Sequence, residues 1–153
     1  MKKILFTLLL ISSFLQAQNV LSTRLQNSIS NAEHIDQKFS IRIEMQDKVD
    51  AFQLHQDYIL TQTPVKERAT KTIKKLKHNA NTSQENLINF LKNNTPSSYN
   101  TFRKYWITNQ IYLEGTQDLI YQIAERNDVA YVDLNIDKIS PIEEVSSILQ
   151  HAV

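Results

Sequence analysis

The chain has 153 residues, with 17 basic and 16 acidic side chains, no cysteine and a single glycine, Gly115. This length suits one domain with its own core but not a protease joined to a regulatory domain, and the balanced charge argues against a partner chosen by charge, such as nucleic acid. Without cysteine there is no thiol nucleophile or thiolate metal site, and one glycine excludes a glycine-rich phosphate loop and a Gly-x-Ser-x-Gly nucleophile turn.

The N-terminus has the pattern of a secretory signal peptide over residues 1–17. Lys2 and Lys3 precede an almost wholly apolar run over residues 4–15, and Ala17 offers a small residue for cleavage. The run is shorter than the roughly 20 residues of a membrane span. We therefore predict a secreted or periplasmic protein that begins near Gln18, carries 15 basic against 16 acidic residues, and contacts no membrane after cleavage.

The first part of the mature chain predicts a loosely held arm followed by a strand. Residues 18–37 are polar, with a few apolar side chains near helical spacing, and predict a flexible N-terminal arm that can include a short helix. Phe39, Ile41, Ile43 and Met45 alternate with polar residues, which indicates a half-buried strand. Residues 47–62 fit either a helix or a packed loop.

The second part predicts a long helix, a hairpin, a helix and a last strand. Thr63 and Pro64 are typical of a helix start, and apolar spacing continues to residue 91, with a possible restart over 82–85. Aromatic and β-branched residues over 99–106 and 110–114 predict a β-hairpin. Gly115 can supply a positive φ after it, and residues 116–126 and 129–135 predict a helix and a strand.

The order strand, helix, strand, strand, helix, strand predicts an α+β fold of the ferredoxin-like split βαβ type. Such a chain closes as one antiparallel four-stranded sheet with two helices on one face. We expect this domain to cover residues 38–137, with residues 138–153 as a C-terminal tail. Because this fold hosts many unrelated activities, the element order alone assigns no function.

Three sequence segments give information about function that the element order does not. They are Thr82-Ser83-Gln84 with Asn89-Phe90-Leu91, then Tyr105-Trp106-Ile107-Thr108-Asn109-Gln110-Ile111, then Leu113-Glu114-Gly115-Thr116 followed by Ala124-Glu125-Arg126-Asn127-Asp128-Val129-Ala130-Tyr131-Val132. Together, in this order, they resemble the propeptide or peptidase-inhibitor domain of bacterial subtilisin-like serine proteases, especially the subgroup related to bacillopeptidase F. The resemblance covers roughly residues 38–135.

The resemblance implies a non-catalytic domain that inhibits a subtilisin-like protease or assists its folding, in cis or in trans. In such families the open face of the sheet packs on two helices of the protease, and the extended tail lies in the active-site cleft. The tail residues implied here are Leu134, Asn135, Ile136, Asp137, Lys138 and Ile139. Trp106 and Asn109 at the hairpin are candidate contacts, although Trp106 can equally pack inside. No cofactor, metal or catalytic residue is expected, and the free chain is expected to be a monomer.

Other interpretations stay open. The chain can be the truncated N-terminal part of a protease precursor, because no catalytic Asp, His and Ser motifs follow, or a small-molecule-binding module of the same fold. Residues 140–143 resemble a capping box and begin a helical spacing, which an extended tail cannot adopt, so either residues 134–139 alone inhibit or this end is the remnant of a junction. The lysine-rich stretch 66–77 is expected to be a solvated helix face.

Overall fold

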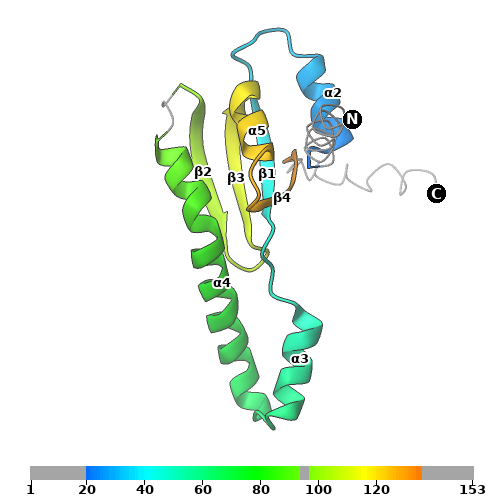
Figure 1. Cartoon of the computed structure of the whole chain (residues 1–153), viewed down its shortest axis with the longest axis vertical. Helices are drawn as coiled ribbons and strands as arrows, with labels where there is room; N and C mark the ends of the chain where they lie inside the picture. The colour runs from blue at the N-terminus through cyan, green and yellow to red at the C-terminus, as the bar shows by residue number, and fades with distance from the viewer. Residues whose placement is uncertain (1–19, 94–96, 136–153) are drawn as a thin grey trace, which may run out of the picture.

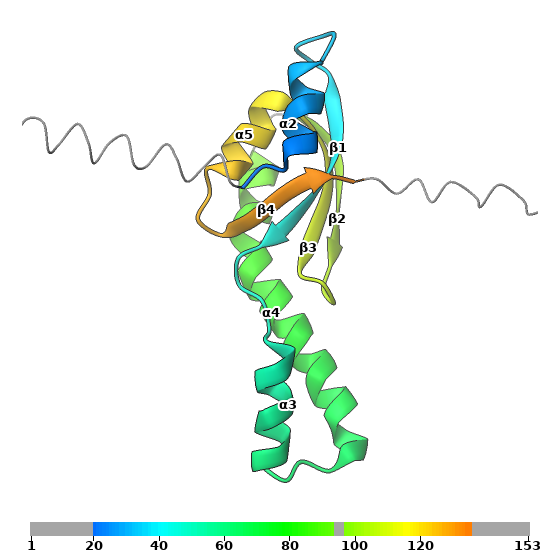
Figure 2. The same ribbon diagram turned by 90° about the vertical axis from the view of Figure 1, so that its right-hand side faces the viewer.

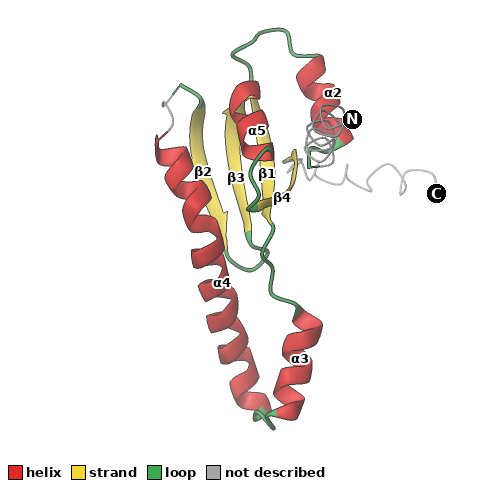
Figure 3. Ribbon diagram, viewed as in Figure 1, coloured by secondary structure: helices red, strands yellow, loops and turns green. Residues whose placement is uncertain are grey.

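The structure, a computed structural model, describes residues 20–93 and 97–135. Its elements in chain order are α2 (Thr23–Ser30), β1 (Lys38–Met45), α3 (Ala51–Leu60), α4 (Val65–Asn93), β2 (Tyr99–Tyr105), β3 (Gln110–Thr116), α5 (Gln117–Ala124) and β4 (Val129–Leu134). The strands form one antiparallel sheet in the order β2-β3-β1-β4 (Figures 1 and 3). The expected α+β fold with a ferredoxin-like split βαβ arrangement is confirmed.

The core lies between the sheet and helices α4 and α5. Every second residue of β1, from Phe39 to Met45, is buried, and β1 is the central strand that pairs with both β3 and β4. Leu87 and Leu91 of α4 pack in the same cluster as Leu119, Ile120 and Ile123 of α5. Both helices therefore cover one face of the sheet, and the other face has no helix over it (Figure 2).

Residues 20–30 are packed, which corrects the expectation of a flexible arm for this part of residues 18–37, whereas residues 33–37 are exposed; the short helix that the expectation allowed is present as α2. Leu21 forms a parallel bridge with Val132, so that Val20–Ser22 lies along the outer edge of β4. Ser22 caps α2, whose Leu25 and Ile29 enter the core with 0% and 3% exposure. The physical reason is that β4 would otherwise be an unpaired edge strand. Residues 18 and 19 lie outside the described residues.

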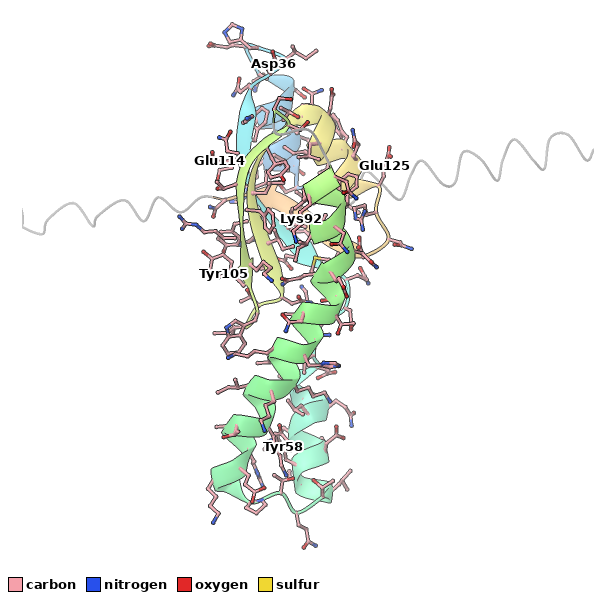
Figure 4. The ribbon with its side chains drawn as sticks, turned by 90° about the vertical axis from the view of Figure 1, so that its left-hand side faces the viewer. Asp36, Tyr58, Lys92, Tyr105, Glu114 and Glu125 are labelled. Carbon is pink, nitrogen blue, oxygen red and sulfur yellow. The ribbon has the colours of Figure 1, made fainter. Side chains whose placement is uncertain are left out.

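Helices α3 and α4 form a hairpin that projects beyond one end of the sheet (Figures 1 and 2). Asp50 caps α3, which settles the open interpretation of residues 47–62 in favour of a helix. Helix α4 runs without a break through Ser83 and Gln84, so no second helix starts there. Within the hairpin, Tyr58 Oη and Thr72 Oγ1 lie 3.1 Å apart (Figure 4). None of the helices in residues 20–93 and 97–135 is long and apolar enough to cross a bilayer.

A buried amide network fixes α4 against the end of the sheet. Gln84 Nε2 donates to Asn109 Oδ1 at 2.9 Å. Asn109 Nδ2 donates to Ser83 Oγ at 2.8 Å and to the carbonyl of Asp47 at 2.5 Å. Three elements, α4, the β2–β3 turn and the segment after β1, therefore meet at one side chain that is only 4% exposed.

The sequence predicted a positive φ at Gly115, after the hairpin, but the structure has the positive φ at Asn109, in the β2–β3 turn. Asn109 has φ of 50°, whereas Gly115 does not have a positive φ and lies inside β3. Asparagine tolerates this region better than most residues, because its short polar side chain finds local partners. An added Cβ at Gly115 would lie 3.3 Å from Leu119 Cδ2, so this side chain would have to shift by a few tenths of an ångström to make room for it.

We predict that Asn109→Ala lowers the free energy of unfolding by about 3 kcal/mol, because it removes the shortest hydrogen bond of Gln84 and the donors to Asp47 and Ser83, and forces alanine into a left-handed backbone. Urea denaturation measures the change. Asn109→Gly should recover about 1 kcal/mol of the loss, since glycine removes the backbone strain alone. The exposed Asn86→Ala on α4 is the control, and a loss there equal to that of Asn109→Ala would contradict the proposed role of the network.

We also predict that Leu25→Ala destabilises the protein by about 3 kcal/mol, because it opens a cavity in the packed core. A flexible arm would show no effect. The matched control is Leu60→Ala, whose side chain is 78% exposed. Equal urea midpoints for Leu25→Ala and the unmodified chain would restore the interpretation of residues 18–37 as an arm.

Candidate functional site

The uncovered face of the sheet is the candidate functional site. Strand register places on this open face the side chains that alternate with the buried ones. They are Ser40, Arg42, Glu44, Arg103, Tyr105, Gln110, Tyr112, Glu114, Tyr131 and Asp133. Figure 4 shows Tyr105 and Glu114 on the side of the sheet away from α4.

The open face is polar and tyrosine-rich. Arg42 and Arg103 balance Glu44 and Glu114 on this face, since Asp133 is buried at 3% exposure. The rings of Tyr105 and Tyr112 lie 4.5 Å apart between centroids, at an angle of 41°. A hollow of about 280 Å³ opens beside them. It is lined by Ser40, Thr101, Arg103, Tyr105, Tyr112, Leu113, Glu114 and Asn135.

The chain reaches this hollow at the end of β4. The backbone N–H of Asn135 donates to the carbonyl of Ser40 at 2.8 Å, and Asn135 Nδ2 donates to Ser40 Oγ at 3.4 Å. Leu134, opposite Ile41, is partly buried against the core. Of the six predicted tail residues the structure thus brings Asn135 to the open face and turns Leu134 towards the helices. Ile136, Asp137, Lys138 and Ile139 lie outside the described residues.

The two candidate hairpin residues have different environments. Trp106 is half-buried and does not belong to the core, and Lys77 Nζ lies 5.2 Å from the centroid of its ring. Its neighbour Ile107 is 64% exposed. Asn109 is buried in the amide network, which corrects its assignment as a surface contact: its hydrogen bonds are made inside the molecule.

An ion pair between the half-exposed Arg24 and the buried Asp133 fastens the N-terminal segment to β4, and the sequence analysis did not predict it. Asp133, 3% exposed, accepts hydrogen bonds from Ser22 Oγ and Arg24 Nε at 2.5 Å each and from a second nitrogen of Arg24. Arg42 approaches the same carboxylate at 3.5 Å. No local pattern could reveal this cluster, because Ser22 and Asp133 are 111 positions apart.

The hydrogen bonds of this cluster shift the pKa values of Asp133 and Arg24. The hydrogen bond from Arg24, helped by that from Ser22, lowers the pKa of Asp133 to about 2, although burial opposes this. The hydrogen bond to Asp133 correspondingly raises the pKa of Arg24. Asp133 is therefore ionised at any neutral or mildly acidic pH and serves as a permanent anchor.

Within residues 20–93 and 97–135, no group of three or more His, Asp or Glu side chains is arranged to hold a metal ion. The described histidines give no sign of a site: His34 lies before β1, while His55 and His78 lie on different helices of the hairpin.

Comparison of the chain with protein-family models, with curated proteins and with solved structures found no match in any of the three. The resemblance to subtilase propeptides therefore rests on the three sequence segments alone. It stays a prediction, to be judged by the geometry of the open face and by experiment.

We predict that Asp133→Asn lowers the free energy of unfolding by about 2 kcal/mol at pH 6, and that this difference shrinks towards zero near pH 2. The folded pKa of Asp133 lies below its ordinary value of 3.8, so its stabilisation is complete above about pH 4 and is lost as the pH falls through about 2. Urea denaturation at several pH values measures it. The exposed Glu85→Gln serves as control, and a pH-independent difference for Asp133→Asn would contradict the anchor.

Proposed function

We propose that the protein is a non-catalytic binding module for a subtilisin-like serine protease and acts as its inhibitor or folding chaperone. The protease docks on the open face, and the segment after β4 enters the active-site cleft. The observation that carries the proposal is the position of Asn135, which lies beside the hollow of the uncovered face. A docked partner would thus meet the sheet and the end of β4 together.

The chemistry of the face supports a reversible, oriented interface. Tyrosine is enriched in protein interfaces because a rigid ring contributes area while its hydroxyl group forms hydrogen bonds, and Tyr105 and Tyr112 stand at the edge of the hollow. Arg103, exposed beside them, offers a fork of donors for carboxylate or carbonyl oxygens.

The size of the face supports a second contact through the tail. Four strands spaced by about 4.8 Å and seven residues rising about 3.3 Å each give a face of roughly 20 by 23 Å. A stable interface buries about 800 Å² of accessible surface per partner, which a face of this size approaches only when it is fully covered. An extended segment in a cleft adds area and main-chain hydrogen bonds, in the manner of an added strand.

We expect the full chain to inhibit a subtilisin-like protease in a peptide-hydrolysis assay, and Tyr112→Ala and Arg103→Glu each to weaken inhibition about tenfold or more, because both remove interface anchors. The matched control is Lys104→Glu, the same charge reversal at the next residue, which lies opposite Ile111 on the helix side of the sheet. Flat activity across micromolar concentrations of the chain would overturn the proposal.

A chain ending at Asn135 separates the two contacts. It should still bind the protease in a surface-binding assay, because the open face is intact, but should no longer block peptide hydrolysis. Undiminished inhibition by the shortened chain would show that residues after Asn135 have no part in it.

A further inference from the structure

The end of the projecting α3–α4 hairpin exposes apolar side chains. Ile59 is 50% exposed, Leu60 78% and Val65 77%. They flank the turn that joins the two helices, so together with Lys66 they form a convex hairpin tip far from the core (Figure 2). Exposed apolar side chains that gather at one place, instead of being scattered singly, mark an interaction surface.

The same hairpin concentrates positive charge. Residues 51–82 contain six basic side chains against only Asp57 and Glu67, a net charge of +4. The six are Lys66, Arg68, Lys71, Lys74, Lys75 and Lys77. The rest of the chain keeps 11 basic and 14 acidic residues, a net charge of −3. The nearly neutral total therefore conceals a strongly basic projection.

Half of these charges are not used inside the molecule. Arg68 Nε donates to the carbonyl of Thr63 at 3.0 Å, Lys71 pairs with Glu67 at 3.2 Å, and Lys77 lies over Trp106. Within the part of the chain that the structure describes, Lys66, Lys74 and Lys75 make no hydrogen bond or ion pair. These ammonium groups are available to an external anion.

We propose that the hairpin tip binds an anionic phospholipid surface, with Leu60 and Val65 entering the head-group region and Lys66 on the lipid phosphates, while Lys74 and Lys75, about 14 Å further along α4, add attraction at longer range. Side chains of this kind, apolar at the contact and lysine-rich around it, are what an interfacial element needs. The sequence alone favoured a solvated helix face and no membrane contact. The exposure of apolar side chains at the basic tip, which spacing could not show, changes that expectation.

Shape and charge favour a lipid surface over other occupants. A second copy of the hairpin would bring +4 against +4 and be repelled. A folded acidic protein would need a pocket that matches a convex tip, whereas a bilayer interface deforms around it. Five of the six basic residues are lysine, which protein interfaces deplete relative to arginine but which suits diffuse attraction to a charged surface.

Vesicle co-sedimentation tests the proposal, with the full chain and, in parallel, the chain from Gln18, which lacks the apolar stretch 4–15. We expect both to bind vesicles of phosphatidylglycerol mixed with phosphatidylcholine, and to bind pure phosphatidylcholine at least about tenfold more weakly. Binding to the mixed vesicles should fall as salt is added, because exposed charges beyond about 10 Å are screened at 0.1 M ionic strength.

Matched variants of the Gln18 chain locate the contact. Lys66→Gln with Lys74→Gln should weaken vesicle binding at least about fivefold, the loss expected for Lys66 at the surface, whereas Lys92→Gln with Lys104→Gln removes the same charge near the sheet and should change it less than about threefold. Leu60→Ser with Val65→Ser should weaken binding about tenfold. Its control is Ile35→Ser, 80% exposed near Asp36 at the opposite end (Figure 4).

Two results would overturn the proposal: no binding of the Gln18 chain to the mixed vesicles, or equal losses in the hairpin and control variants. Absence of vesicle binding together with hairpin-dependent binding to polyglutamate would also overturn it, in favour of an acidic protein partner. Protease inhibition measured on the same variants should not change, because the tip lies outside the open face. The outcome is thus independent of the proposed function.

Discussion

The hydrogen bond from Gln84 to Asn109 sets how the two layers of this protein lie against each other. Apolar contacts between α4 and the sheet are non-directional, so they resist separation of the layers more than sliding of the helix along its axis. The amide network adds direction, since it ties α4 at Ser83 and Gln84 to the β2–β3 turn and to the carbonyl of Asp47. Because α4 extends far beyond the sheet, this point also fixes where the hairpin projects.

Elements with a local signal could be predicted, and those that depend on distant partners could not. The alternation in β1 and the hairpin at 99–114 follow from their own residues, and the sheet order follows from connecting them in the simplest way. The N-terminal segment has few apolar residues, and its order comes from the free edge of β4, more than 100 positions away. Of the two interpretations left open for residues 82–85, a helix restart or a place within one helix, the structure has the second, and Gln84 on the buried side of α4 donates to Asn109.

The candidate site could be predicted only in part, because it too depends on residues that are distant in the sequence. Ser83, Gln84 and Asn109 belong to the segments that carry the family resemblance, and in the structure they meet in one buried network. These three residues of the resemblance therefore stabilise the fold and do not form a partner-binding surface. The open face consists of polar positions such as Arg103 and Tyr112, which become a single surface only when the order β2-β3-β1-β4 is known. The sequence did not indicate Asp133 as an anchor, since Ser22 and Arg24, which donate to its carboxylate, lie more than 100 positions away in the N-terminal segment.

The two proposed surfaces are separated by the antiparallel arrangement of β1 and β4. Asn135 lies beside Ser40 near the start of β1, whereas α3 begins a few residues after β1 ends at Met45. Asn135 and the α3–α4 hairpin therefore lie at opposite ends of β1, and a partner on the open face need not displace one on the hairpin. The surfaces also differ in kind: one is nearly balanced in charge and tyrosine-rich, which suits an oriented protein contact, and the other is basic and convex, which suits a diffuse one. A module held at a charged surface by the second would raise the local concentration of the first without any change in its intrinsic affinity.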